Sequence, residues 1–151
     1  MVVLLDSVTE PQNLGSIVRT AHCCGANGFI IPESRAASVT ASVAKASAGA
    51  VQYLPTAIVV NLVRTIEYLI EKGFWIYGAD ASSDLNIHSP DYEGHIGLVM
   101  GSEGRGIRPL IRKKCDFLIS IPMRGQVASL NVSVATGVIL YEILRKWGKG
   151  S

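Results

Sequence analysis

The chain has 151 residues, of which 48% are hydrophobic and 17% are charged, and its formal net charge at pH 7 is +2. This composition excludes a disordered or fibrous polymer and is typical of one compact α/β domain. No uninterrupted apolar run approaches the ~20 residues that a membrane-spanning helix needs, and the first residues lack the basic start and cleavage site of a signal peptide. We therefore expect a cytoplasmic protein without a membrane partner.

Predicted strands and helices alternate along the chain. Short apolar runs bounded by turn residues predict strands at 2–5, 28–31, 57–60, 74–79, 96–100 and 117–121. Helical spacing of apolar residues predicts helices at 14–24, 38–50, 62–72, 109–114 and 131–146. We expect Asn13 and Asn61 to cap the first and third of these helices, and Gly25 to end the first. The alternation predicts an α/β fold, with a mostly parallel sheet and helices on both faces.

Ligands of such sheets bind beyond the carboxyl ends of the strands, so the loops there are the places to look for a site. In the first loop Asn13 stands where a helix begins, Arg19 follows within two turns, and Gly15 leaves the backbone between them open to close approach. The same residues are also compatible with a capped helix that carries one exposed arginine.

A glycine-rich loop, 101–106, follows the predicted strand 96–100. It lacks both the Gly-Lys-Ser/Thr ending of a phosphate-binding loop and the spacing of a dinucleotide fingerprint. Its backbone N–H groups can still face an acceptor, and Glu103 either orients a cationic partner or caps the following turn.

The third loop leads into the last predicted helix and is unusually polar. Ser129, Asn131 and Ser133 crowd the start of an otherwise apolar helix, which is more polar side chain than one N-cap requires. This excess indicates a functional site.

Together the three loops resemble the three motifs of the SpoU (TrmH-like) family of RNA ribose 2′-O-methyltransferases. The matching segments are 13–21, 98–107 and 121–133, and the likeness extends to 45–50 and to essentially the whole chain. Members that modify guanosine in 23S ribosomal RNA are the most similar. The resemblance implies a SPOUT fold with a C-terminal trefoil knot, and a homodimer with its sites near the subunit interface.

The resemblance also implies a methyl donor and two sets of site residues. S-adenosylmethionine would be held by Ala79, Gly101, Ile121, Met123 and Leu130. The catalytic residues would be Asn13, Arg19, Glu103, Ser129 and Asn131. A guanidinium is normally always charged, so we expect Arg19 to bind phosphate and to stabilise or receive the developing charge rather than act as a simple base.

Other polar residues suggest no further chemistry beyond one basic stretch. Arg105, Arg108, Arg112, Lys113 and Lys114 form either a solvated face or a phosphate-facing surface. We interpret Cys23, Cys24 and Cys115 as structural, and His22, His88 and His95 share no metal-ligand spacing, so no metal is expected. We interpret Trp75 and Tyr77 as strand core, and Trp147 as packing near the end of the last helix.

The predicted organisation is a catalytic domain at 1–147 and a short flexible tail at 148–151. The N-terminal RNA-binding domain of longer relatives is expected to be absent, because the chain opens directly on its first strand. The alternatives are a transfer RNA methyltransferase and a non-catalytic RNA-binding relative. A Rossmann-type nucleotide enzyme is disfavoured because no glycine follows the first strand before Pro11.

Overall fold

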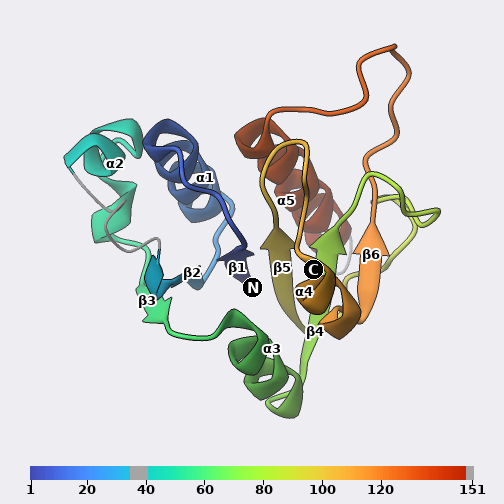
Figure 1. Ribbon diagram of the computed structural model, residues 1–151, viewed down its shortest axis with the longest axis horizontal. Helices are drawn as coiled ribbons and strands as arrows, with labels where there is room; N and C mark the ends of the chain where they lie inside the picture. Colours follow the sequence, from blue (N-terminus) through green and yellow to red (C-terminus); the bar gives the residue numbers. More distant parts are fainter. Residues whose placement is uncertain (35–40, 149–151) are drawn as a thin grey trace.

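A computed structural model describes residues 1–34 and 41–148. Its centre is a parallel six-stranded sheet with the strand order β3-β2-β1-β5-β4-β6 (Figure 1). The strands are β1 (Val2–Leu5), β2 (Gly28–Pro32), β3 (Thr56–Val59), β4 (Phe74–Ala79), β5 (His95–Met100) and β6 (Phe117–Ile119). The central strands β1 and β5 are almost continuously apolar, as strands covered on both faces must be.

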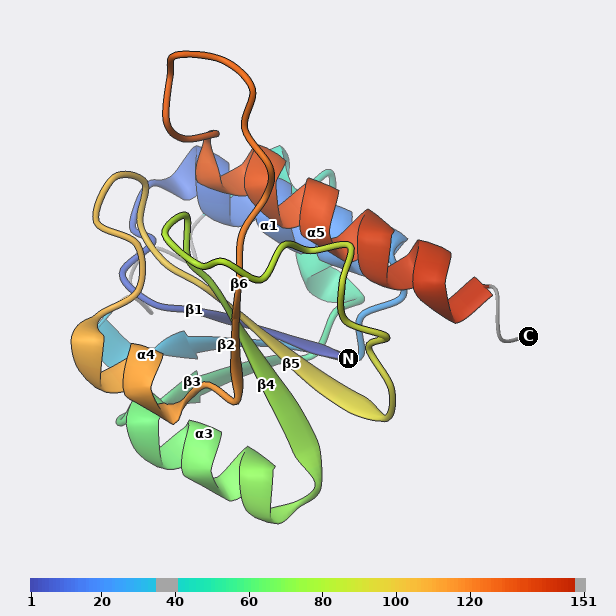
Figure 2. The same ribbon diagram turned by 90° about the vertical axis from the view of Figure 1, so that its right-hand side faces the viewer.

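Helices cover both faces of this sheet. They are α1 (Pro11–Cys23), α2 (Ala41–Ala46), the 3₁₀ turn η2 (Ala50–Gln52), α3 (Leu62–Glu71), α4 (Pro109–Lys114) and α5 (Val132–Gly148). Figure 2 shows α1 and α5 on one face, and α3 and α4 on the other. Alternate side chains of each strand point to opposite faces of the sheet, so each face has its own hydrophobic core. Val3 and Leu5 pack on the α1 and α5 side, whereas Leu4 packs on the α3 side. The predicted α/β class is therefore confirmed.

Helix caps confirm one sequence prediction and overturn another. Asn61 caps α3, because its side chain accepts a hydrogen bond from the backbone N–H of Arg64 at 3.1 Å. The prediction that Asn13 caps α1 is wrong: Glu10 is the N-cap, and its carboxylate accepts the N–H groups of Gln12 and Asn13 at 3.0 Å each. Helix α1 therefore begins at Pro11, which suits the first turn because proline has no N–H to satisfy, and the side chain of Asn13 is free for another role.

The structure also tests the predictions for three aromatic residues and for two segments of the chain. Trp75 is 49% exposed on β4, so its assignment to the core is wrong, whereas Tyr77 on the same strand is buried. Trp147 packs as expected, with Nε1 donating to the carbonyl of Tyr92 at 2.6 Å. Of the predicted helix 38–50, the described part is α2 followed by η2, and 38–40 lie outside the described residues. Residues 149–151 of the predicted tail also lie outside them.

The chain crosses itself on the carboxyl side of the sheet. From β5 it passes through α4 to β6, beyond β4, and then returns over β4 and β5 to α5, which packs on α1. The returning segment is tied to the loop after β4: Ser120 pairs with Asn86, and its hydroxyl donates to the carbonyl of Ser83 at 2.9 Å. In the part of the chain described here, no helix is long and apolar enough to cross a membrane.

Glu142 on α5 makes stability depend on acid pH. Arg145 donates two hydrogen bonds to its carboxylate at 2.7 and 2.8 Å, and His88 Nδ1 lies 3.1 Å from it. The bonds from Arg145 come first among the causes that lower the pKa of Glu142 from 4.5 to about 2. A depressed folded-state pKa contributes stability above pH 4.5, and this contribution is lost as the pH falls towards 2.

We therefore expect Glu142→Gln to lower the free energy of unfolding by about 1 kcal/mol at neutral pH, allowing for solvent screening. The difference in free energy of unfolding between Glu142→Gln and the wild type narrows as the pH falls below 4.5. Urea unfolding across a pH series measures it, with the exposed Glu71→Gln on α3 as the matched control. A Glu142→Gln difference that stays constant from neutral pH to pH 3 contradicts the assignment.

Candidate active site

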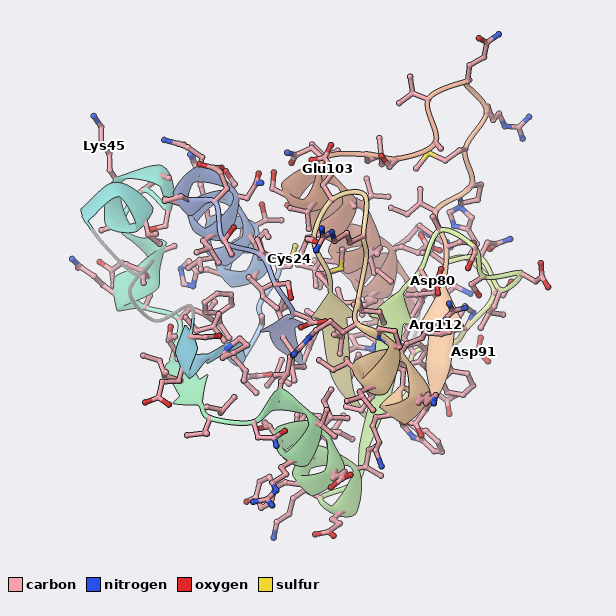
Figure 3. All side chains as sticks on the ribbon, in the orientation of Figure 1. Cys24, Lys45, Asp80, Asp91, Glu103 and Arg112 are labelled. Carbon is pink, nitrogen blue, oxygen red and sulfur yellow. The ribbon has the colours of Figure 1, made fainter. Side chains whose placement is uncertain are left out.

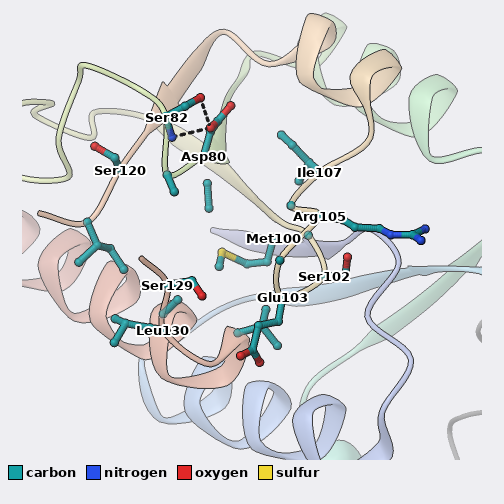
Figure 4. A pocket seen from close by; sticks show the side chains of 18 of the residues that line it. Asp80, Ser82, Met100, Ser102, Glu103, Arg105, Ile107, Ser120, Ser129 and Leu130 are labelled. Atoms are coloured by element: carbon teal, nitrogen blue, oxygen red, sulfur yellow. Dashed lines mark hydrogen bonds between the residues drawn. The ribbon is translucent and has the colours of Figure 1, made fainter. Parts of the chain in front are cut away.

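A cavity of about 470 Å³ opens where β4, β5 and β6 end (Figure 4). Its walls come from the ends of these three strands and the loops that follow them, and from the start of α5. The residues that contribute are 79–82, 100–107, 119–121, Met123 and 128–130, with Arg112 of α4 and Val132, Ala135 and Ile139 of α5. The volume is in the range of small-molecule sites, and the position beyond the carboxyl ends of parallel strands is where ligands of α/β sheets bind.

Gly101 shapes the base of this cavity. A Cβ atom at this position would overlap the backbone of Gly106 and Ile107, so the two ends of the loop approach each other more closely than any other residue allows. The loop is closed by a bridge between Ser102 and Gly106, whose N–H donates to the Ser102 carbonyl at 2.8 Å. The sequence indicates the glycine-rich loop, but only the fold shows that its glycine serves this pinch.

All five residues predicted to hold the methyl donor line the cavity. They are Ala79, Gly101, Ile121, Met123 and Leu130. Further apolar residues that the sequence did not identify as part of a site also line the cavity, namely Met100, Ile107, Ile119 and Ile139. Their apolar character identified them only as core, because a residue at a strand end faces either the core or a cavity, and the sequence alone does not distinguish the two.

The predicted catalytic residues divide into three groups. Glu103 and Ser129 line the cavity. Asn13 and Asn131 meet beside it, since Asn131 Nδ2 donates to Asn13 Oδ1 at 3.1 Å, while Asn131 Oδ1 accepts the N–H of Ser133 at the start of α5. Arg19 is exposed on α1 and is not part of the cavity lining. A single chain thus joins Asn13 to Asn131 and places Glu103 and Ser129 in one cavity, while Arg19 belongs to neither group.

Gly15 serves packing between helices. A Cβ at this position would collide with Ala46 on α2, and the backbone of Ser47 is also within 3.0 Å. The close approach expected at this glycine is therefore made by a neighbouring helix. This contact requires small residues at the facing positions, Ala46 and Ser47.

Asp80, at the end of β4, is a polar lining residue that the sequence analysis missed. Its carboxylate accepts the N–H of Ser82 at 2.8 Å, and Arg112 Nε lies 2.9 Å from it (Figure 3). Burial alone would raise the pKa of Asp80, but the hydrogen bonds from Ser82 and the charge of Arg112 outweigh burial, so the pKa lies below its ordinary value. The carboxylate is held ionised at one edge of the cavity.

The basic stretch at 105–114 proves to be largely paired. Arg108, Arg112 and Lys114 make ion pairs with Asp6, Asp80 and Glu67. Within residues 1–34 and 41–148, Arg105 and Lys113 have no such partner, and of these two Arg105 lines the cavity. A phosphate-facing role for the whole stretch is therefore not supported, and Arg105 is its member best placed to meet an anionic ligand.

An apolar groove runs between α1 and α5 on the outer surface. Ser16 and Thr20 of α1 line it, together with Ser133, Val134, Gly137, Val138 and Tyr141 of α5. Val134 is 53% exposed and Tyr141 58%, which is unusual for large apolar side chains on a helix. Arg19 is on α1 beside this groove, three residues from Ser16.

A parallel α/β sheet with a pinched, ligand-sized cavity at its carboxyl edge is typical of domains that bind a small molecule. Residues 1–141 match the model of the SpoU rRNA methylase family. The chain belongs to the SpoU family, as its three sequence motifs predict.

Individual relatives agree with this placement. YacO of Bacillus subtilis, named as a TrmH family tRNA/rRNA methyltransferase, is 49% identical over 95% of this chain and 58% of its own length. The 23S rRNA (guanosine-2′-O-)-methyltransferase RlmB of Pseudomonas aeruginosa is 46% identical over 97% of this chain and 59% of its own.

A solved structure confirms the SPOUT type of fold predicted from the motifs. The SpoU methyltransferase AviRb of Streptomyces viridochromogenes, in complex with AdoMet, superimposes with a TM-score of 0.92 at 30% identity. The superposition covers 99% of this chain and 61% of AviRb. The chain thus spans less than two thirds of each of these three relatives.

Proposed function

We propose that this domain transfers a methyl group from S-adenosylmethionine to a ribose 2′-hydroxyl of RNA. The observation that supports this most directly is the cavity at the ends of β4, β5 and β6. It is lined by all five residues expected to hold the donor and has Glu103 and Ser129 at its edge. AviRb has the same fold and is described as binding AdoMet.

The cavity fits such a donor by size and by chemistry. Met100, Ile119 and Leu130 provide apolar surface for a nucleoside, and the pinch at Gly101 brings backbone polar groups close to the space above it. The cavity also carries polar groups for the donor's charged atoms: the carboxylates of Asp80 and Glu103 line it, and Arg112 pairs with Asp80 at 2.9 Å. S-adenosylmethionine supplies an electrophilic methyl group when bound.

The residues of this chain must position the ribose and assist loss of the hydroxyl proton as the oxygen attacks. Orientation alone accounts for a large part of the acceleration of such displacements. Ser129 and the Asn13–Asn131 pair form the wall facing the ribose, and Glu103 orients a cationic group. Arg19 provides that cation, binding the phosphate beside the reacting ribose and stabilising the charge that develops on its oxygen.

We propose a homodimer built on the α1/α5 groove. The exposed apolar side chains Val134, Val138 and Tyr141 gain from burial against a second copy, because each removes apolar area from water. Such a contact covers the helix that carries Arg19, and it places the arginine at the subunit interface. Arg19 then lies outside the cavity of its own chain because it acts at the subunit interface.

Ribosomal RNA is the substrate we favour, and guanosine in 23S RNA the target. RlmB of Pseudomonas aeruginosa, 46% identical, is named for that reaction, whereas YacO is named for tRNA and rRNA together. Arg105, at the rim of the cavity, is available for the phosphate backbone in either case. Transfer RNA remains the second candidate.

Two measurements test the proposal in sequence. Isothermal titration with S-adenosylhomocysteine is expected to show saturable binding near one per chain. Incubation with tritiated S-adenosylmethionine and transcripts of 23S rRNA or tRNA then identifies the substrate. We expect label in the rRNA within dinucleotides that resist alkali, because a methylated 2′-oxygen cannot attack the adjacent phosphate. Label in tRNA alone would overturn the rRNA assignment, and a folded protein that does not bind S-adenosylhomocysteine would point to the non-catalytic relative.

A further inference from the structure

Asp6, the residue directly after β1, is fully buried although it does not line the cavity. A buried carboxylate is costly unless hydrogen bonds and an opposite charge compensate it. Asp6 receives both from one residue, Arg108: the backbone N–H donates to Oδ2 and the side-chain Nε to Oδ1, each at 2.7 Å. The two residues are 102 positions apart in the chain.

Asp6 also binds the strand that leads into the glycine-rich loop. Its own N–H donates to the carbonyl of Met100 at 2.8 Å, continuing the pairing of β1 with β5. Met100 immediately precedes the loop 101–107 and Arg108 immediately follows it. Asp6 therefore contacts both ends of the loop: its backbone N–H donates to Met100 before the loop, and its carboxylate accepts from Arg108 after it.

The geometry around Asp6 is specialised for this contact. Ser7 follows with φ = 65°, a left-handed conformation that is uncommon for a residue other than glycine. Its hydroxyl donates to Asp6 Oδ1 at 3.3 Å. Arg108 is the N-cap residue of α4, and its N–H, which has no partner within the helix, donates to the Asp6 carboxylate. A strained conformation persists only where the surrounding structure enforces it, so the backbone of Ser7 indicates that the position of Asp6 is constrained.

We propose that Asp6 is a positioning residue that holds the loop 101–107 in the shape that accepts the methyl donor. The inference rests on the proposed function only in naming that donor. The pinch at Gly101 needs both ends of the loop to stay in contact, and the Asp6–Arg108 pair prevents them from separating. A loop held in advance does not have to be ordered by the ligand, so affinity is higher than for a loose loop.

The test compares variants of this pair with a matched ion pair on the same helix. Asp6→Asn is isosteric and removes the charge, Arg108→Gln removes only the side-chain half of the contact, and the double variant removes both. Glu67→Gln breaks the Glu67–Lys114 pair, 2.8 Å long, which ties α4 to α3 and does not involve the loop. Each protein is titrated with S-adenosylhomocysteine, and hydrogen exchange is followed in the peptide that carries 101–107.

We expect Asp6→Asn to raise the Kd for S-adenosylhomocysteine about tenfold or more, and Arg108→Gln about threefold to tenfold. The double variant should resemble Asp6→Asn, because both changes remove one contact. Exchange of the loop amides should speed up in all three variants and stay unchanged in Glu67→Gln. Arg108→Gln keeps the backbone N–H that donates to Asp6 Oδ2 and changes a side chain that is 59% exposed, so it is the milder change, and thermal unfolding checks that each variant is folded.

Unchanged affinity and unchanged loop exchange in Arg108→Gln overturn the proposal. So does a general loss of thermal stability with no specific loosening of the loop, because that result describes a purely structural ion pair. If the wild type itself fails to bind S-adenosylhomocysteine, the proposed function is wrong, and loop exchange alone then decides whether Asp6 holds the loop.

Discussion

Replacing Gly101 by alanine is expected to weaken binding of S-adenosylhomocysteine by roughly 10- to 100-fold, the range that corresponds to overpacking of a tight site. The added Cβ overlaps the backbone of Gly106 and Ile107, and backbone cannot rotate away as a flexible side chain can. The loop must therefore open at its base and distort the cavity. Isothermal titration gives the affinity, and thermal unfolding shows whether the variant remains folded.

Gly125→Ala is the matched control for this substitution. Gly125 lies in the exposed segment between β6 and α5, which projects from the body of the molecule (Figure 1), and a Cβ there meets no atom within 4 Å. Its φ is also not positive, so alanine is tolerated. Equal affinity of Gly101→Ala and Gly125→Ala would show that the donor does not use the pinched loop.

Arg19→Ala is expected to leave S-adenosylhomocysteine binding unchanged and to reduce methyl transfer about 100-fold or more, as loss of one stabilising donor does in other transfer reactions. Arg19 lies outside the cavity, so the donor does not depend on it. Binding of the RNA phosphate and stabilisation of the charge that develops on the attacking oxygen do depend on Arg19. Single-turnover transfer to the RNA that the wild type modifies measures the effect, with the exposed Arg64→Ala on α3 as the control for loss of one positive charge.

Mixed dimers test whether Arg19 acts in the site of its own chain or in the site of the partner chain. If Arg19 acts at the interface, co-expressed Arg19→Ala and Glu103→Ala chains should form mixed dimers with partial activity, because one intact site can assemble from the two chains. Activity no higher than that of the separate variants would show that each chain uses its own Arg19. Full transfer by Arg19→Ala alone would remove the residue from the mechanism.

The order of strands and helices follows from sequence patterns that act over a few residues. Apolar runs such as 96–100, and the cap at Asn61, depend on neighbours in the chain, and the structure agrees with them. The cap of α1 shows the limit of such reasoning. Glu10 and Asn13 can both accept N–H groups, and the choice of Glu10 frees Asn13 to accept a hydrogen bond from Asn131, 118 residues away.

By itself the sequence determined the α/β class, the alternation of elements and the three loops with most of the expected site residues. Only the tertiary structure decided that Asp6 meets Arg108, that Asp80 meets Arg112 and that Arg19 stands apart from the cavity. The physical reason is that these arrangements depend on segments far apart in the sequence, which meet only through the strand order of the sheet. Hydrophobic periodicity and capping describe local backbone choices, whereas a contact between distant residues depends on strand order and on the path of the crossing.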